Sequence, residues 1–206
     1  MCAITETDRR FVADVRDGIY HATSIDNYRQ IRECGKIKHN DGTLSSTTDT
    51  SKLSKAVEIG GISFFDFETP DESIILNHSD GIYKWKHVLL CRPTIVMIGF
   101  KREALPLQPR CHDELEQQLG CGGILPYGLE VCYPGDVELA LAFKHVLICN
   151  GNFSILDYEI HSGDTLTDTI LDAVAIKHER LIAVHLRKTG RGKYLSSHRH
   201  ILKNAP

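Results

Sequence analysis

Long hydrophobic runs are absent from this sequence. No stretch of its 206 residues approaches the roughly 18 consecutive apolar residues that a membrane-spanning helix needs. The first eighteen residues, MCAITETDRRFVADVRDG, are rich in charge and lack the apolar segment of a secretory signal. We therefore expect a cytoplasmic protein without a transmembrane segment.

Paired cysteine motifs are also absent. The seven cysteines are an odd number and none forms a CxxC pair, so we expect reduced thiols rather than a disulfide framework. Cys111, His112 and Cys121 are close in sequence but lack the ligand spacing of structural zinc sites. The sequence predicts no metal site.

The familiar catalytic motifs are missing too. There is no P-loop, no GxGxxG after a strand, no HExxH and no GxSxG, which argues against the enzyme classes that those motifs define. What is present is an ordinary globular composition. Hydrophobic residues make up 42% and charged residues 25%, so the chain can bury a core and general disorder is unexpected.

Positive charge is concentrated at the C-terminal end. Residues 186–206 contain six Lys or Arg and no acid, whereas the other 185 residues carry 18 basic and 27 acidic side chains, a net charge of −9. We expect a single domain over residues 1–185 and a basic tail over 186–206. A basic tail on an acidic body is either a nucleic-acid-binding arm or a solvated terminus. The nucleic-acid candidates are Arg187, Lys188, Arg191 and Lys193.

Apolar periodicity predicts an α+β fold. Residues 18–23 are expected to form a strand, Ser24 to cap a helix over 25–34, and Gly35 to end it. A long helix is expected from an Asp164 cap, although residues 181–186 could equally form a strand. Loops are expected at 41–54, a short helix at 113–119, and further strands at 61–67, 88–91, 94–100, 127–133, 144–149 and 155–160.

A few polar side chains in these strands could carry chemistry. Strand alternation puts His21 and Thr23 on one face, where they could bind a ribose or an amide, or be satisfied within the core. Glu130 is unusual inside a strand, and alternation of Leu129 and Val131 toward the core would direct it to the opposite face, with Cys132. Phe64, Phe65 and Phe67 could stack on a planar ring or simply fill the core.

Several motifs together resemble a known superfamily. The segment YHATS, followed by the helix IDNYRQIRECGKI, is similar to the opening of ADP-ribosyltransferases of the DarT-like and H-Y-E-like branches. The strand SFFDF and the later LEV, followed by a Pro-Gly turn and an apolar strand, occur in the order found there. The resemblance covers about residues 18–150.

The resemblance implies a fold, a substrate and a set of roles. The fold would be a split, two-sheet α+β core with few helices and a cleft for NAD⁺. The activity would be NAD-dependent mono-ADP-ribosyl transfer to a macromolecular acceptor, with nucleic acid as one candidate. Glu130 would be the catalytic residue, and its carboxylate would meet the His21 imidazole across the cleft. NAD⁺ would be bound by His21, Thr23, Ser63, Phe64, Phe65 and Tyr20.

Several departures keep other functions open. DarT-like enzymes carry an arginine soon after the aromatic strand, and this chain has none there; Lys84, Lys86 and Arg92 are the candidate replacements, and Tyr83 is a candidate for nicotinamide stacking. The alternatives are a non-catalytic module that binds a nucleotide, ADP-ribose or a partner, an enzyme like the RNA 2′-phosphotransferases, and an interaction protein in which the first motif is coincidental.

Overall fold

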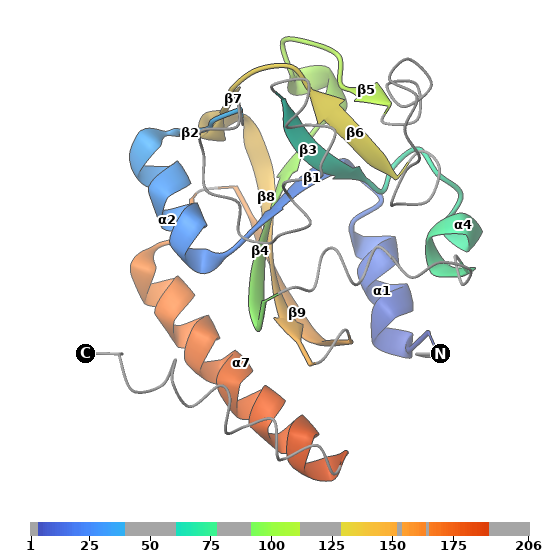
Figure 1. Cartoon of the computed structure of the whole chain (residues 1–206), viewed down its shortest axis with the longest axis vertical. Helices are drawn as coiled ribbons and strands as arrows, with labels where there is room; N and C mark the ends of the chain where they lie inside the picture. Colours follow the sequence, from blue (N-terminus) through green and yellow to red (C-terminus); the bar gives the residue numbers. More distant parts are fainter. Residues whose placement is uncertain are drawn as a thin grey trace.

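An antiparallel sheet forms the centre of the protein in a computed structural model, which describes residues 4–39, 61–77, 92–111, 129–151, 154–163 and 165–189 (Figure 1). Within these residues the sheet has seven strands in the order β5-β6-β3-β1-β4-β8-β9, and β2 pairs with β7 in a second, two-stranded sheet. The strands are β1 (Ile19–Thr23), β2 (Lys36–Ile37), β3 (Ile62–Asp66), β4 (Thr94–Phe100), β5 (Arg110–Cys111), β6 (Glu130–Tyr133), β7 (Val137–Glu138), β8 (Ala142–Asn150) and β9 (Ile155–Ser162).

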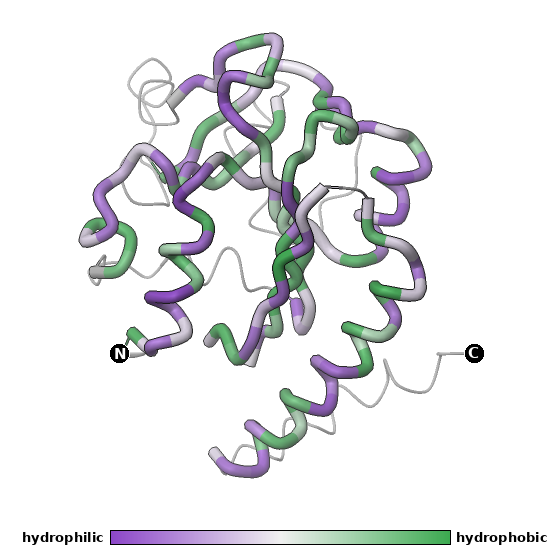
Figure 2. The backbone as a smooth tube through the Cα atoms, turned by 180° about the vertical axis from the view of Figure 1, so that it is seen from behind, coloured by the Kyte–Doolittle hydropathy of each residue, from purple (hydrophilic) through white to green (hydrophobic). Residues whose placement is uncertain are grey.

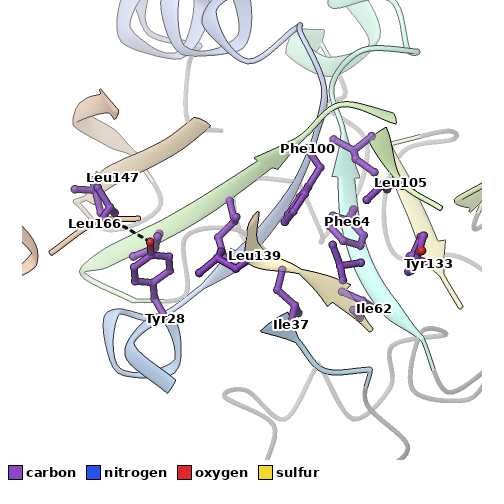
Figure 3. Packing of buried hydrophobic residues seen from close by; sticks show 14 of the residues in the cluster. Tyr28, Ile37, Ile62, Phe64, Phe100, Leu105, Tyr133, Leu139, Leu147 and Leu166 are labelled. Carbon is purple, nitrogen blue, oxygen red and sulfur yellow. Dashed lines mark hydrogen bonds between the residues drawn. The ribbon is translucent and has the colours of Figure 1, made fainter. Parts of the chain in front are cut away.

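Helices cover both faces of the large sheet. Side chains from α1 and α4 join one buried hydrophobic cluster, and side chains from α2 and α7 join the other, which Figure 3 shows from close by. Each face of the sheet therefore has its own core. The described helices are α1 (Glu6–Asp14), α2 (Ile25–Cys34), α4 (Glu72–Asn77), α7 (Asp168–Lys188), and the 3₁₀ turns η2 (Arg102–Ala104) and η3 (Leu139–Leu141).

Strand β4 shows why the sheet needs both layers. Its sequence, TIVMIGF, is apolar almost throughout, and Met97 lies in the α1 cluster whereas its neighbours Val96 and Ile98 lie in the α2 cluster. Alternating side chains of one strand point to opposite faces, so a strand that is apolar at every position must be covered on both. Helix α7 is different: hydrophobic and hydrophilic residues alternate along it in Figure 2, as expected for a helix with one buried face.

Short polar side chains begin three of the helices. The backbone N–H groups of Asp8, Asn27 and Ile170 donate to the side chains of Thr5, Ser24 and Thr167, which are the N-caps of α1, α2 and α7. Gly35 ends α2 with a φ of 71°, in the left-handed region that glycine adopts at little cost.

The large sheet is weakly joined between β1 and β3. These strands pair only at Ile19 with Asp66 and at Tyr20 with Phe65. Beyond Tyr20, β1 continues alongside β4 as far as Thr23, while β3 pairs with β6 from Ile62 to Phe65. The pairing of β1 with β3 therefore ends at the pair Tyr20–Phe65, one residue before His21 in β1.

The α+β prediction is confirmed, together with most of the strands in the described residues. Helix α2, its Ser24 cap and its Gly35 stop are as predicted, and β4 matches its predicted range. Helices α1 and α4 were not predicted. The predicted loop at 41–54, the strand at 88–91, the helix at 113–119 and the first two residues of the 127–133 strand lie outside the described residues.

The start of the C-terminal helix differs from the expected one. Helix α7 begins after a Thr167 cap rather than at Asp164, and it continues through residues 181–186 as a helix. It ends at Lys188, with Leu186 buried, so the expected boundary between residues 185 and 186 falls inside a packed helix. No helix in the described part of the chain is long and apolar enough to cross a membrane.

Candidate functional site

Ser63 connects the two side chains that the sequence singled out most strongly. Its backbone carbonyl is 3.1 Å from Nδ1 of His21, and its hydroxyl donates a short hydrogen bond to Oε1 of Glu130. His21 lies on β1, Ser63 on β3 and Glu130 at the start of β6, so the two bonds connect three strands. All three residues are half-buried.

The bond to Ser63 defines the form of the His21 ring. A carbonyl oxygen can only accept a hydrogen bond, so Nδ1 must carry the proton. Burial lowers the pKa of His21 below its usual value, with the carbonyl of Ser63 acting in the opposite direction, so the ring is neutral near pH 7. Nε2 then bears a lone pair, and within the described residues it has no hydrogen-bond partner. It can accept a hydrogen bond from a hydroxyl group.

Aromatic packing fixes the plane of the His21 ring. The ring meets Phe64 edge-on, with centroids 5.8 Å apart and planes at 65°. Phe64 is itself held edge-on by Phe100 and Tyr133. The imidazole is therefore positioned by a rigid cluster as well as by Ser63.

Strand register gives the relation between His21 and Glu130. Glu130 pairs with Phe65, which pairs with Tyr20, so these three side chains share a face. His21 follows Tyr20 and belongs to the opposite face, that of Phe64. The prediction that the His21 imidazole and the Glu130 carboxylate meet directly is therefore wrong, because the strand register places them on opposite faces of the sheet. The link runs through Ser63, at the point where β1 and β3 separate.

The expected orientation of Glu130 also needs correction. Alternation predicted that Leu129 and Val131 would face the core and that Glu130 and Cys132 would face away from it. The structure buries Leu129, Val131 and Cys132, with clusters on both faces of the sheet. Because both faces of this sheet are covered by buried clusters, the burial of Leu129 and Val131 does not determine whether Glu130 faces solvent.

Four other predicted NAD⁺-binding residues lie mostly in the cores. Tyr20 is fully buried and its hydroxyl donates to Oδ1 of Asp17 at 2.5 Å. Phe64 has no exposed surface, and Phe65 stacks on Phe67 with 7% exposed. Thr23 is 9% exposed. Core packing thus accounts for both phenylalanines and Tyr20, and their rings are not available for stacking on a ligand.

The basic candidates are only partly described. Arg187 and Lys188 are exposed in the last turn of α7, and Arg92 is exposed just before β4. Arg191, Lys193, Lys84, Lys86 and Tyr83 lie outside the described residues.

One pair of polar residues was missed by sequence reasoning. Asp66, at the end of β3, is 2% exposed and forms an ion pair with Arg102, with Nη2 2.5 Å from Oδ2. Its other oxygen accepts the backbone N–H groups of Glu68 and Thr69, each at 3.0 Å. The sequence feature that could have identified Asp66 is its position at the end of a strand, just before the turn-forming residues Glu68-Thr69-Pro70. Arg102 therefore neutralises a buried carboxylate that ends the strand.

No group of three or more His, Cys, Asp or Glu side chains in the described ranges is arranged to hold a metal ion. Comparison with known proteins adds no relative: no family model, no curated protein and no solved structure matches this chain. The functional argument therefore rests on the geometry around Ser63.

Proposed function

We propose that this protein is an NAD-dependent mono-ADP-ribosyltransferase in which Glu130 is the catalytic carboxylate. The observation that carries the proposal is the pair of hydrogen bonds at Ser63, which hold a neutral imidazole and a carboxylate at the separation of β1 and β3. The order of these residues along the chain is the one that the sequence resemblance implies.

The reaction would break the bond between nicotinamide and ribose. The bonding electron pair leaves with the nicotinamide, which becomes neutral, and positive charge develops on the ribose as an oxocarbenium ion. The acceptor nucleophile then bonds to the anomeric carbon and releases a proton. Glu130 would accept a hydrogen bond from a ribose hydroxyl, stabilise the developing charge and take up that proton.

Ser63 and His21 would act as supports for this chemistry. The Ser63 hydroxyl donates to one oxygen of Glu130 and so orients its carboxylate. His21 would accept a hydrogen bond from a ribose hydroxyl through Nε2, because Nδ1 is committed to the Ser63 carbonyl. Both interactions are preformed, so little reorganisation is needed when the substrate binds.

Glu130→Gln tests the assignment with little change in shape. We expect it to reduce release of nicotinamide from labelled NAD⁺ at least 100-fold, since removing one preorganised electrostatic group typically costs ~10²–10³ in rate. Glu138→Gln is the matched control, because Glu138 is an exposed carboxylate on β7. Turnover by Glu130→Gln equal to that of the Glu138→Gln control would remove Glu130 from the mechanism.

The acceptor is proposed from charge alone. Arg187 and Lys188 are exposed at the end of α7, and the sequence beyond them is basic, which fits a nucleic acid. Binding to single-stranded DNA should weaken as salt rises, because released counterions contribute to the affinity. Binding that does not change with salt would exclude the nucleic-acid acceptor and favour a protein or a small molecule instead.

A second function has one observation in its favour. The rings of Phe64 and Phe65, expected to hold nicotinamide, are packed in the cores. A module that binds ADP-ribose or a nucleotide without cleaving it needs no nicotinamide contact. Binding of ADP-ribose without any release of nicotinamide from NAD⁺ would identify this second function.

A further inference from the structure

Strand β9 forms one edge of the large sheet in the described part of the chain. It lies at the opposite end of the strand order from β5 and β6 (Figure 1). Its eight residues, ILDYEIHS, pair with β8 on the inner side and include neither proline nor lysine. Proline and lysine are common protections of an exposed edge strand, so β9 is a template on which a further strand could pair.

The register with β8 shows which backbone groups of β9 point outward. The N–H of Gly163 donates to the carbonyl of Phe143 at 3.0 Å, which continues the β8–β9 register by one step. In an antiparallel pair, residues that exchange backbone hydrogen bonds alternate with residues that do not. Counting back from Gly163, every second residue therefore directs its backbone groups toward β8. The residues between them, which direct theirs away from β8, are Tyr158, Ile160 and Ser162.

The side chains along this edge also suit a second strand. Nζ of Lys177, on α7, lies 2.9 Å from Oδ2 of Asp157 and 2.6 Å from Oε1 of Glu159, so the acids of β9 are neutralised within the chain. Ile160 is 39% exposed. Val184 is also exposed, and it lies two turns after Lys177 on the same side of α7. The β9 edge thus combines unpaired backbone groups with exposed apolar surface.

We propose that two copies of this chain form a two-fold dimer by antiparallel pairing of β9 with β9, centred on Ile160. Ile160 and Ile160 of the partner subunit would exchange two backbone hydrogen bonds. Tyr158 would pair in the same way with Ser162 of the partner subunit, and Ser162 with Tyr158 of the partner subunit. All three residues whose backbone groups point outward would then gain partners, and the exposed isoleucine side chains would lie side by side.

Charge selects this register among the neighbouring ones. With Ile160 on the axis, Glu159 lies opposite His161 of the partner subunit, and an imidazole can donate a hydrogen bond to a carboxylate. An axis at Glu159 would place two copies of that carboxylate opposite each other. An axis at Tyr158 would place Asp157 opposite Glu159 of the partner subunit. Like charges directly opposite each other in a sheet are destabilising, so the register centred on Ile160 is favoured.

Sedimentation of the full chain over a dilution series tests the dimer. We expect the wild-type protein to show a monomer–dimer equilibrium. Ile160→Lys places two like charges at the axis and removes the apolar contact, so it should raise the dissociation constant by about tenfold or more. The matched control is Ile74→Lys on α4, because Ile74 is 43% exposed and lies outside β9. This control should dimerise like the wild-type protein.

Ile160→Cys tests the register without depending on the lysine variant. Residues that form a hydrogen-bonded antiparallel pair have Cα atoms about 5.5 Å apart, a separation that a disulfide can bridge. Mild oxidation should therefore link two copies of Ile160→Cys, as seen on a non-reducing gel. The wild-type protein, in which Cys34 is exposed, gives the background, and Ile74→Cys should not exceed it.

Three results would overturn the dimer. They are a wild-type protein that stays monomeric at every concentration, an equal loss of dimer in Ile160→Lys and Ile74→Lys, and the absence of cross-linking above background in Ile160→Cys. Circular dichroism shows whether Ile160→Lys is folded, and the cysteine variant decides if it is not. Four strands separate β9 from β6, so release of nicotinamide can be present or absent independently of this dimer.

Discussion

Ser63 serves the candidate site through two different groups. Its carbonyl sets the tautomer of His21 and its hydroxyl orients Glu130. The backbone contact depends on the strand path, whereas the side-chain contact depends on the residue type. At the level of single residues, the site is thus a hydrogen-bonded chain rather than two side chains facing each other.

Two buried histidines should make the stability depend on pH. His145 is 1% exposed and contacts the Tyr28 hydroxyl, with Nε2 3.1 Å from that oxygen, while His178 is fully buried and lies 3.0 Å from the Thr94 hydroxyl through Nδ1. Burial lowers the pKa of each to about 4. In the unfolded chain the pKa is about 6.5, so protons bind the unfolded state first as the pH falls.

The stabilisation from these histidines is fully present above pH 6.5 and is lost as the pH falls toward 4. We expect the free energy of unfolding, measured with urea, to fall by about 2 kcal/mol per histidine between pH 7 and pH 5. His145→Gln should have a shallower pH dependence than the wild-type protein. Parallel profiles for the two proteins would show that His145 does not titrate in this way.

Among the elements, α7 shows how a cap determines where a helix begins. Thr167 accepts a hydrogen bond from the backbone N–H of Ile170 at 3.4 Å. The next turn is tied to α2, since Arg29 and Arg32 form ion pairs with Asp168. Such exposed pairs contribute little to stability, so the cap should dominate locally.

Thr167→Ala should destabilise the protein by about 1 kcal/mol, because it leaves a backbone donor of α7 without its partner. Thr169→Ala is the matched control, since Thr169 is exposed in the first turn and is not the cap. Its effect should stay within about 0.5 kcal/mol. Thermal unfolding of both variants measures the difference, and equal effects would rule out Thr167 as the effective cap.

For the whole molecule, the separation of β1 from β3 divides the sheet into two parts. Strands β1, β4, β8 and β9 pair along most of their lengths, and β4 is almost wholly buried. Strands β3, β5 and β6 are joined to them by the short pairing at Ile19 and Tyr20. The two parts share both cores, and the ladder between them is limited to this two-residue pairing.

Hydrogen exchange should reveal this division. We expect the amides of β4 and β8 to exchange most slowly, and those of β3 and β6 to open together at a lower free energy. Exchange followed by mass spectrometry on the intact protein would test it. Equal protection in β3 and β4 would mean that the sheet opens as one unit.

Local interactions made several parts of the protein predictable from sequence. The Ser24 cap, the spacing of Ile25, Tyr28 and Ile31, and Gly35 specify α2 through contacts a few residues apart. The short apolar, β-branched runs of β4 and β8 also indicate strands from local sequence alone. His21 and Glu130 could be singled out because burying a polar side chain within a strand costs free energy unless the side chain has a hydrogen-bond partner.

Long-range pairing decided what the sequence could not. Alternation says that His21 and Tyr20 point to opposite sides, but only the pairing of β1 with β3 and of β3 with β6 says which side Glu130 shares. The same pairing buried the aromatic rings expected at the site. Side-chain direction is a local property of the backbone, whereas the neighbours across a sheet depend on how distant segments come together.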